Sequence, residues 1–258
     1  MRLRKPGSIA LRMVTETMSD CRANVRSVTI ITHFDGYPAK SFSCRMWAMQ
    51  LRSKLNSAPF QLVAGHPVLD FVNTLDWRFR ATGSEELLNH YADLLCFSEQ
   101  SGLLTSLEVR KLATGDLIRK KRILSSTKKL RECLASILYA IAAGQAPQIE
   151  DVRTLSTFAR TVRETEDLEW CVSRLQWKAD KHRANALDTP FRKLASAALD
   201  LLTSEELNKL SACSNPECRW LFLDGSKNRG RRWCDMKLCG NRIKARRYRG
   251  RQHAAAPR

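Results

Sequence analysis

Four of the nine cysteines of this 258-residue chain lie in two pairs near the C-terminus. Four residues separate Cys213 from Cys218, four separate Cys234 from Cys239, and fifteen lie between the pairs. Each pair can form a tight turn, and the segment between them is long enough for a hairpin that brings four thiolates to one ion. The spacing predicts one structural Zn²⁺ per chain with these cysteines as ligands. An iron–sulfur cluster and a chance arrangement are the alternatives.

The other five cysteines are scattered singly, and the odd total does not fit a disulfide framework. No run of apolar residues approaches the roughly 18 to 20 that cross a membrane. The basic N-terminus leads to no cleavage site of a secretion signal. We expect a cytoplasmic protein with reduced thiols and no membrane partner.

The charge of the chain is concentrated at its two ends. The formal net charge is +18 and the isoelectric point is near 9.9. Residues 1–58 carry 10 lysines and arginines against 3 acidic residues, and residues 213–258 carry 13 against 3. Residues 59–212 carry 21 against 20 and are close to neutral. This distribution favours a polyanionic partner, and nucleic acid is the expected one.

The sequence after Cys239 predicts a basic helix. No helix breaker occurs from Ile243 to Arg249, and we expect the helix to end at Gly250. On a period of 3.6 residues the cations fall on two adjoining faces, which suits contact with phosphates and leaves Ile243 and Tyr248 to pack on the finger. The predicted nucleic-acid-binding residues are Arg231, Arg232, Arg242, Lys244, Arg246, Arg247, Arg249 and Arg251.

Part of this charge has a structural explanation, because four thiolates around Zn²⁺ leave a net charge of −2. The arginines close enough in sequence to offset it are Arg219, Arg231, Arg232 and Arg242. The thirteen cations of this region exceed what the ion needs. Trp220, Phe222 and Trp233 are expected to form the small core of the finger, in preference to a platform on which bases stack.

The region upstream of the finger has the periodicity of amphipathic helices. Ser84 followed by Glu85 and Glu86 predicts a helix that starts there, and Thr105 with Glu108 forms a capping box that opens a helical hairpin region ending at Gly144. Further elements are predicted at Ile149–Arg163 (helix), 168–177 (β-hairpin), after Asp188 and Pro190 (helix) and after Ser204 (short helix to Leu210). The predicted fold is mainly α: a helical domain followed by a small Cys₄ finger of the zinc-ribbon or treble-clef-like kind, which ends in the basic helix.

Four segments follow from these patterns. Residues 1–58 show no sustained period and are predicted to be a disordered extension or to precede the true start at Met46 or Met49; a basic arm that contacts nucleic acid is the alternative. Residues 59–205 form the helical domain, residues 212–252 the finger and residues 253–258 a tail.

Two motifs resemble those of a known family. The run "RRWCDMKLCGNR" is similar to the C-terminal zinc finger of the bacterial CGNR family, and "CSNPECRWLFLDGSKN" resembles its first knuckle. Upstream, "PVLDFVNTLDWR" resembles the opening of the ABATE domain that accompanies this finger. The resemblance covers residues 59–252. It implies a stress-induced transcription regulator with a helical sensor-like domain and a zinc-dependent nucleic-acid-binding module.

The upstream motif supplies a second candidate site at Asp70, Asn73, Thr74 and Arg78. At helical spacings of three and four, these side chains could line a pocket for a small molecule. The other interpretation is that they hydrogen-bond neighbouring loops and hold the start of the domain in place, and it is the favoured one, since buried polar groups usually bind backbone.

The leading functional hypothesis is a DNA-binding transcription regulator whose helical domain senses a signal or partner. An RNA-binding protein is the next hypothesis, because charge does not distinguish DNA from RNA. A protein-interaction adaptor that uses the finger as its docking surface is a third. We do not expect an enzyme: the five histidines fall in unrelated contexts, and four cysteine ligands leave a zinc ion no open position for water. The sequence leaves the oligomeric state open.

Overall fold

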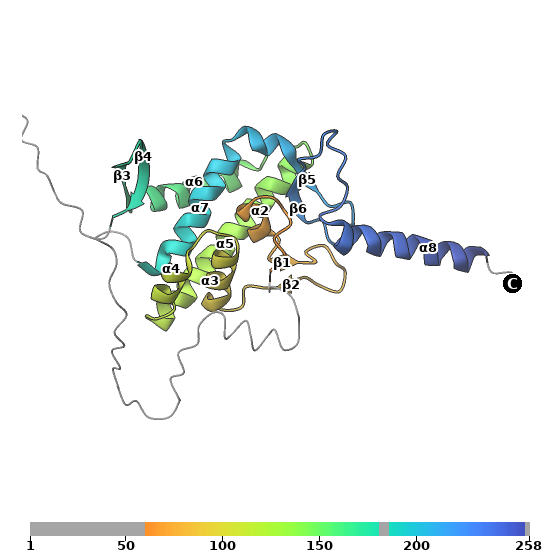
Figure 1. Cartoon of the computed structure of the whole chain (residues 1–258), viewed down its shortest axis with the longest axis horizontal. Helices are drawn as coiled ribbons and strands as arrows, with labels where there is room; N and C mark the ends of the chain where they lie inside the picture. Colours follow the sequence, from red (N-terminus) through yellow and green to blue (C-terminus); the bar gives the residue numbers. More distant parts are fainter. Residues whose placement is uncertain (1–59, 181–185, 256–258) are drawn as a thin grey trace, which may run out of the picture. The chain divides into compact units, whose positions relative to one another are not determined.

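The computed structural model describes residues 60–180 and 186–255, except for the side chains at position 247 and from position 250 onward (Figure 1). The predictions for residues 1–58 lie outside the described residues. The fold is mainly α with a small cysteine-containing finger, as the sequence predicts. Within the described residues no helix is long and apolar enough to cross a membrane.

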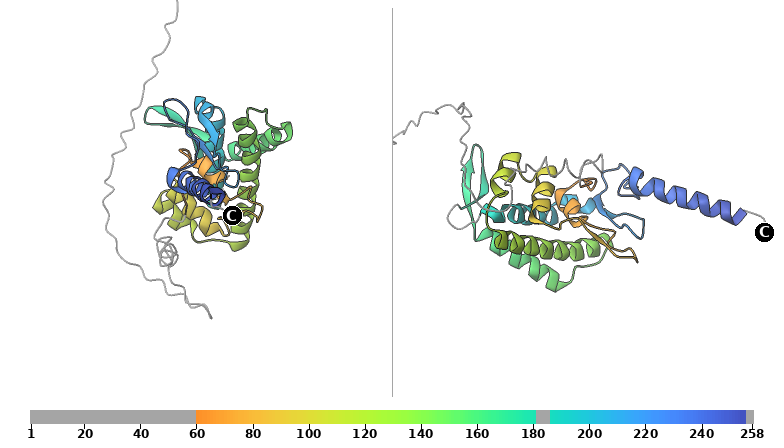
Figure 2. Two further views of the ribbon diagram at one scale, coloured as in Figure 1. Left: turned by 90° about the vertical axis from the view of Figure 1, so that its right-hand side faces the viewer. Right: turned by 90° about the horizontal axis from the view of Figure 1, so that it is seen from below.

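The longest helix, α5, forms the centre of the helical domain (Figures 1 and 2). Its buried side chains include Leu130, Leu134 and Leu138, which recur every four residues and make one apolar face. Four other helices contact α5. The bounds are α2 (Pro67–Val72), α3 (Tyr91–Gln100), α5 (Leu117–Ala142), α6 (Ile149–Arg163) and α7 (Thr189–Leu202), and the short α4 (Ser106–Leu112) contacts α3.

Three pairs of antiparallel strands accompany the helices in the described ranges. They are β1 (Leu75–Asp76) with β2 (Glu85–Glu86), β3 (Glu166–Cys171) with β4 (Arg174–Ala179), and β5 (Leu210–Ala212) with β6 (Leu221–Leu223). The last pair belongs to the finger. Its residue Leu221 is fully buried and joins the same apolar core as α2 and α5, so the finger has no separate core of its own.

Several predicted elements are confirmed where local signals decide them. Thr105 caps α4 by accepting the N–H of Glu108, and the Glu108 carboxylate accepts the N–H of Thr105 in return. The helix Ile149–Arg163 has the predicted bounds, and the β-hairpin forms. Asp188 precedes α7 as predicted, although its side chain makes no capping hydrogen bond. The segment after Ser204 is a short 3₁₀ helix, η2 (Glu205–Lys209), and Leu210 begins a strand.

The predicted helix from Ser84 is wrong. Residues Glu85–Glu86 form strand β2, and the helix begins only at Tyr91. The Glu86 carboxylate turns toward α5 and accepts the N–H of Leu88 at 2.8 Å. Asp93 then accepts the N–H of His90 at 2.6 Å and so starts α3 at a later residue.

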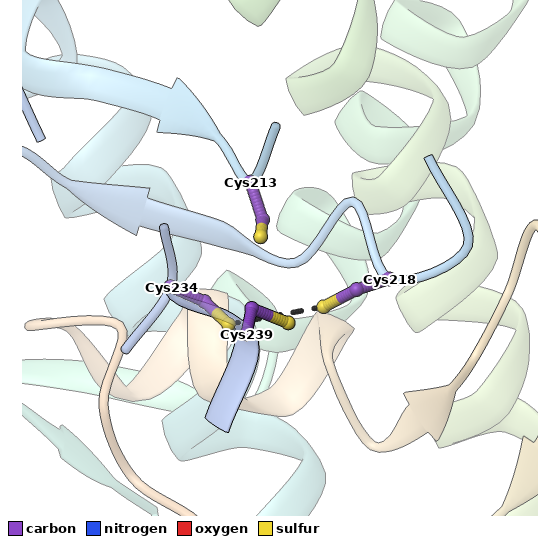
Figure 3. A group of neighbouring side chains, drawn as sticks. All are labelled: Cys213, Cys218, Cys234 and Cys239. Atoms are coloured by element: carbon purple, nitrogen blue, oxygen red, sulfur yellow. Dashed lines mark hydrogen bonds between the residues drawn. The ribbon is translucent and has the colours of Figure 1, made fainter. Parts of the chain in front are cut away.

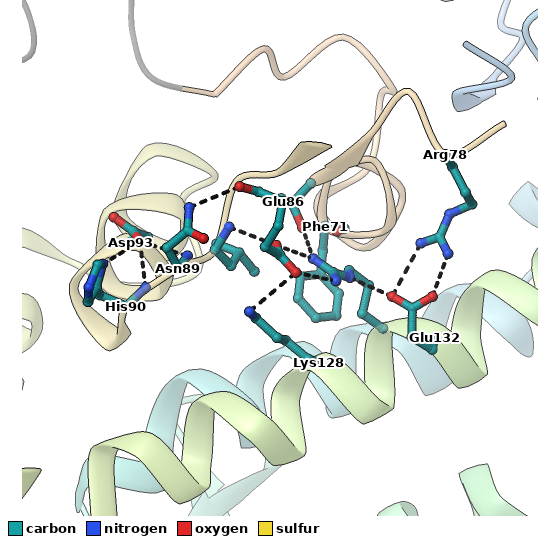
Figure 4. Close-up of polar contacts among 11 residues, drawn as sticks. Phe71, Arg78, Glu86, Asn89, His90, Asp93, Lys128 and Glu132 are labelled. Carbon is teal, nitrogen blue, oxygen red and sulfur yellow. Dashed lines mark hydrogen bonds and ion pairs between the residues drawn. The ribbon is translucent and has the colours of Figure 1, made fainter. Parts of the chain in front are cut away.

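The interaction that overrides the local signal is a salt bridge to α5 (Figure 4). The guanidinium of Arg131, which is 2% exposed, donates to both oxygens of Glu86 at 2.8 and 2.7 Å. Burial alone would raise the pKa of Glu86, but the hydrogen bonds from Arg131 and Leu88 outweigh it and lower that pKa. Lys128 approaches the same carboxylate at 3.3 Å from the more exposed side.

We predict that Arg131→Met lowers the free energy of unfolding by about 3 kcal/mol, because it leaves Glu86 half buried without its bidentate partner. Lys128→Met removes the more exposed partner of the same carboxylate and should cost less than about 1 kcal/mol. The pKa of Glu86 is lowered in the folded protein, so the stability that depends on its ionised form is complete above the ordinary glutamate pKa. The difference in free energy of unfolding between Arg131→Met and the unchanged protein should therefore shrink as the pH falls through the folded-state pKa. Urea unfolding at several pH values measures both effects, and equal costs for the two variants would contradict the assignment.

Candidate metal centre

The first cysteine pair lies in the turn of the β5–β6 hairpin. Cys213 follows β5, and its N–H donates to the carbonyl of Trp220 at 2.8 Å. The N–H groups of Cys218 and Arg219 both donate to the carbonyl of Asn215 and close the turn, in which Arg219 has a φ of 55°. These backbone bonds point the thiols of Cys213 and Cys218 to one side of the hairpin (Figure 3).

The second pair is positioned by the start of a helix. Asp235 accepts the N–H groups of Lys237 and Leu238 at 2.6 and 3.1 Å, and it starts the short π-helical turn η3 (Met236–Gly240). This turn carries Cys239 and leads directly into α8 (Asn241–Ala255). The N–H of Ser214 donates to the carbonyl of Arg232 at 2.8 Å and ties the segment before Cys234 to the first turn.

The four thiols converge on one buried point (Figure 3). The Sγ atoms of Cys213, Cys218, Cys234 and Cys239 all lie within 4.8 Å of one another, and every one of these residues is buried. A tetrahedron with Zn–S bonds of about 2.3 Å has sulfur–sulfur edges of about 3.8 Å. The Sγ atoms of Cys218 and Cys234 are 3.8 Å apart, which fits that edge. The donor set and its geometry therefore suit a tetrahedral zinc site.

The charges of the thiols also indicate a cation. Hydrogen bonds from the other three thiols lower the pKa of Cys213, whereas the bond to Cys213 raises the pKa of Cys218. Without an ion the four groups must share protons, because four buried thiolates at this separation repel one another. A divalent cation at their centre removes the conflict and allows all four to ionise.

The finger is attached to the helical domain by reciprocal hydrogen bonds. The side-chain amide of Asn73, just after α2, donates to the carbonyl of Leu221 at 3.0 Å and accepts the N–H of Leu221 at 3.0 Å. The indole of Trp220 donates to Asp76 at 2.9 Å, and the hydroxyl of Tyr139 on α5 donates to the carbonyl of Arg219 at 3.1 Å. All three contacts hold the strand or turn next to the first cysteine pair.

Two family models match the chain in the order that this architecture requires. The ABATE model, described as "Putative stress-induced transcription regulator", matches residues 65–205, and the CGNR zinc finger model matches residues 209–252. The chain belongs to the ABATE family. A search of the curated proteins found no match.

The side chains of the ABATE motif make separate hydrogen bonds to the protein. Asp70 accepts the N–H of Ala64 at 3.0 Å, and burial raises its pKa to about 6. Asn73 binds Leu221 in the finger, and the Thr74 hydroxyl donates to the carbonyl of Phe71 at 2.7 Å. Arg78 forms a salt bridge with Glu132 on α5. These bonds have the form expected of residues that hold backbone in place, and a ligand at the four residues stays a prediction.

The basic residues of the CGNR finger divide into two groups. Arg231 is bound to the protein: it donates to the carbonyls of Val63 and Trp233 at 3.0 Å each and also to the carbonyl of Cys234. Of the other predicted nucleic-acid-binding residues, five are exposed: Arg232, Arg242, Lys244, Arg246 and Arg249. Of these, Arg246 lies 3.5 Å from the carboxylate of Glu217. The side chains of Arg247 and Arg251 lie outside the described residues.

Helix α8 departs from its predicted form at two points. It continues through Gly250 to Ala255, because one glycine costs a helix only about 1 kcal/mol relative to alanine and the residues after it favour helix. Tyr248 is exposed and does not pack on the finger, whereas Ile243 is partly buried. Trp220 and Phe222 are buried and Trp233 is partly buried, so these three do contribute to the core.

Two residues beside the basic helix were missed in the sequence. The guanidinium of Arg242, at the start of α8, lies 4.7 Å from the ring centre of Trp77, and that of Arg80 lies 3.9 Å from the same ring. Trp77 and Arg80 precede Arg242 by more than 160 residues, so no spacing in the sequence connects them with it. The only signal was the aromatic and basic composition of "DWRFR" after the ABATE motif.

We predict that Asn73→Ala lowers the free energy of unfolding by about 2–3 kcal/mol, because it leaves the buried N–H and carbonyl of Leu221 without partners. Asn89→Ala is the matched control: the exposed Asn89 amide donates only to the carbonyl of Glu86, and its loss should cost less than about 0.5 kcal/mol. Thermal and urea unfolding of the full chain measure both costs. Equal stability of the two variants would show that the finger is held by other contacts.

Proposed function

We propose that this ABATE-family protein is a zinc-dependent, DNA-binding transcription regulator in which α8 contacts the phosphates of the duplex. The observation that carries the proposal is the composition and position of α8. Residues Asn241–Ala255 include six lysines and arginines and no acidic residue, and the helix begins directly after the ligand Cys239. The metal centre therefore sets the position of a strongly basic helix.

The charge of α8 exceeds what the metal centre requires. Zn²⁺ with four thiolates has a net charge of −2, and Arg231 is already held against the backbone beside Cys234. Lys244 and Arg249 are exposed. Cations in such positions repel one another until an anion binds, and a nucleic-acid backbone supplies anions at regular spacing.

The loop that contains Trp77 extends this surface. Arg80 and Arg242 both lie against the Trp77 ring, so two guanidiniums are held near the start of α8 by one aromatic side chain. Arg80 belongs to the helical domain and Arg242 to the finger. A DNA duplex bound to both residues would contact the helical domain and the finger together. The helical domain is therefore the proposed site at which a signal or partner alters DNA binding.

The proposal includes no catalytic step. Four protein thiolates would complete a tetrahedral shell around Zn²⁺ and would leave the ion no open position for water or substrate. The proposed role of the ion is to hold the two turns and α8 in their relative positions.

We predict one zinc ion and no iron per chain in the reduced, purified protein. Each single change of Cys213, Cys218, Cys234 or Cys239 to Ser should release the metal and unfold the finger, because apparent zinc-site energies are about 10–16 kcal/mol. Cys133→Ser changes a buried cysteine of α5 outside the centre and should retain the metal. Elemental analysis measures the content; metal-free or iron-containing reduced protein would refute this assignment.

We predict that binding to duplex DNA weakens steeply with salt, with a log–log slope of about −4 to −5 if five phosphates are contacted. The double change Lys244→Ala/Arg249→Ala should lower affinity on every sequence and reduce the slope by about two, without loss of zinc. The double change Arg110→Ala/Lys111→Ala removes the same charge from exposed positions of α4 and should leave the slope unchanged. Glu217→Gln should raise affinity, because it frees Arg246 from its ion pair.

Fluorescence anisotropy with labelled DNA and RNA of the same sequence makes these measurements and also tests the alternatives. Tighter binding to RNA assigns the RNA-binding function instead. If both double variants, on α8 and on α4, keep their zinc and change the DNA affinity equally, α8 makes no specific phosphate contacts. This result would favour the protein-interaction adaptor.

A further inference from the structure

The hairpin of β3 and β4 has one apolar face. Its register pairs Leu168 with Trp177 and Trp170 with Leu175. Directly opposed residues of an antiparallel pair point to the same side, and side chains alternate between the two sides along each strand. These four apolar side chains therefore share one face. The opposite face carries polar and charged residues together with Cys171.

This apolar face is exposed in the single chain. The exposed fractions are 49% for Leu168, 69% for Trp170, 56% for Leu175 and 50% for Trp177. An isolated two-stranded hairpin is marginally stable in water and needs a surface to pack against. At the end of the hairpin next to α6, the guanidinium of Arg163 lies 4.3 Å from the centre of the Trp177 ring and covers part of the face. At the other end of the hairpin, no described residue provides a surface for the apolar side chains to pack against.

The turn of the hairpin also indicates that this region packs against another surface. Val172 has a φ of 57° and is fully exposed. A β-branched residue is strained in this left-handed region, and a valine in water gains nothing from burial. Neither backbone preference nor packing within the described residues accounts for an apolar residue at this position.

The charges of the hairpin are balanced, in contrast to those of the whole protein. Glu166 pairs with Arg163 at 2.8 Å, and Glu169 lies 3.7 Å from Lys178 across the strands. Asp167 and Arg174 add one charge of each sign. In a chain with a net charge of +18, this surface can meet an identical copy of itself without bringing like charges together.

We propose that the apolar face of the β3–β4 hairpin is a dimer interface, occupied by the same face of a second copy of this chain around a twofold axis. The two copies would stack face to face, so that each indole packs on the leucines and indole of its partner. The four side chains expose about 450 Å² of apolar surface per copy, or about 900 Å² for the pair. With Val172 and the rim, this area reaches the lower limit of specific interfaces, which suits a weak, reversible dimer.

The composition of the hairpin favours a protein over nucleic acid as occupant. Exposed tryptophans can stack on bases, but such platforms lie in positively charged grooves. Here the carboxylates of Glu166, Asp167 and Glu169 balance the nearby cations, so the hairpin presents no positively charged groove to a phosphate backbone.

The test is sedimentation of the full, zinc-loaded chain after nuclease treatment, at rising protein concentration and at low and high salt. We expect a monomer–dimer equilibrium that salt does not weaken, because the interface is apolar. Trp170→Ser/Leu175→Ser changes one opposed pair on the apolar face and should raise the dissociation constant at least about tenfold. Glu169→Ser/Gln176→Ser changes the adjacent opposed pair on the other face and should leave it unchanged.

Hydrogen exchange of the unchanged protein provides a measurement that does not depend on folding of the variants. Protection of the amides in Glu166–Cys171 and Arg174–Ala179 should rise with protein concentration. A protein that stays monomeric at every concentration, or two double variants with equal dissociation constants, would overturn the proposal. A monomer whose hairpin is protected at all concentrations would assign the face to another segment of the same chain. DNA binding is measured separately, so neither result depends on the proposed function.

Discussion

The meeting of four thiols at one buried point is the constraint on which the rest of the finger depends. Cys213 and Cys218 come from the turn of a hairpin, Cys234 from a loop, and Cys239 from the start of a helix, so three kinds of backbone geometry must agree within a few ångströms. If all four thiols ionise, their mutual repulsion requires a cation at the centre. The convergence of the four thiols also fixes the direction of α8, because this helix starts two residues after Cys239.

The finger is also a structural part of the helical domain. Strand β6 packs on α2 and shares its apolar core, and the side chain of Asn73 replaces a strand neighbour by exchanging both hydrogen bonds with Leu221. The ABATE motif therefore has a physical explanation: its aromatic and aliphatic residues form the core, while its polar residues bind backbone. Because of these contacts, a metal ion bound by the four thiols would also stabilise the helical domain.

The sequence was sufficient for several features whose signal is local and is not overridden by a distant contact. The capping box of Thr105 and Glu108, the helix Ile149–Arg163 and the cysteine spacing each depend on residues within one or two turns. The sequence was insufficient where a contact with a residue far away in the chain determines the local structure. Glu86 has the local context of a helix start but binds Arg131, which lies 45 residues away, and Asn73 binds Leu221 across 148 residues. The placement of Arg242 against Trp77 depends on the same docking, which no periodicity reveals.

Helix α5 connects regions that are far apart in the domain. With 26 residues and a rise of about 1.5 Å per residue, it is a rod about 39 Å long. Near its start, Arg119 lies 3.7 Å from the carboxylate of Asp188, just before α7. Near its last turn, the Tyr139 hydroxyl donates to the carbonyl of Arg219 in the turn that carries Cys213 and Cys218. A continuous helix is stiff along its axis. A displacement of the first turn of α5 along the helix axis would therefore also move Tyr139 and, through its hydrogen bond to Arg219, the turn that carries Cys213 and Cys218.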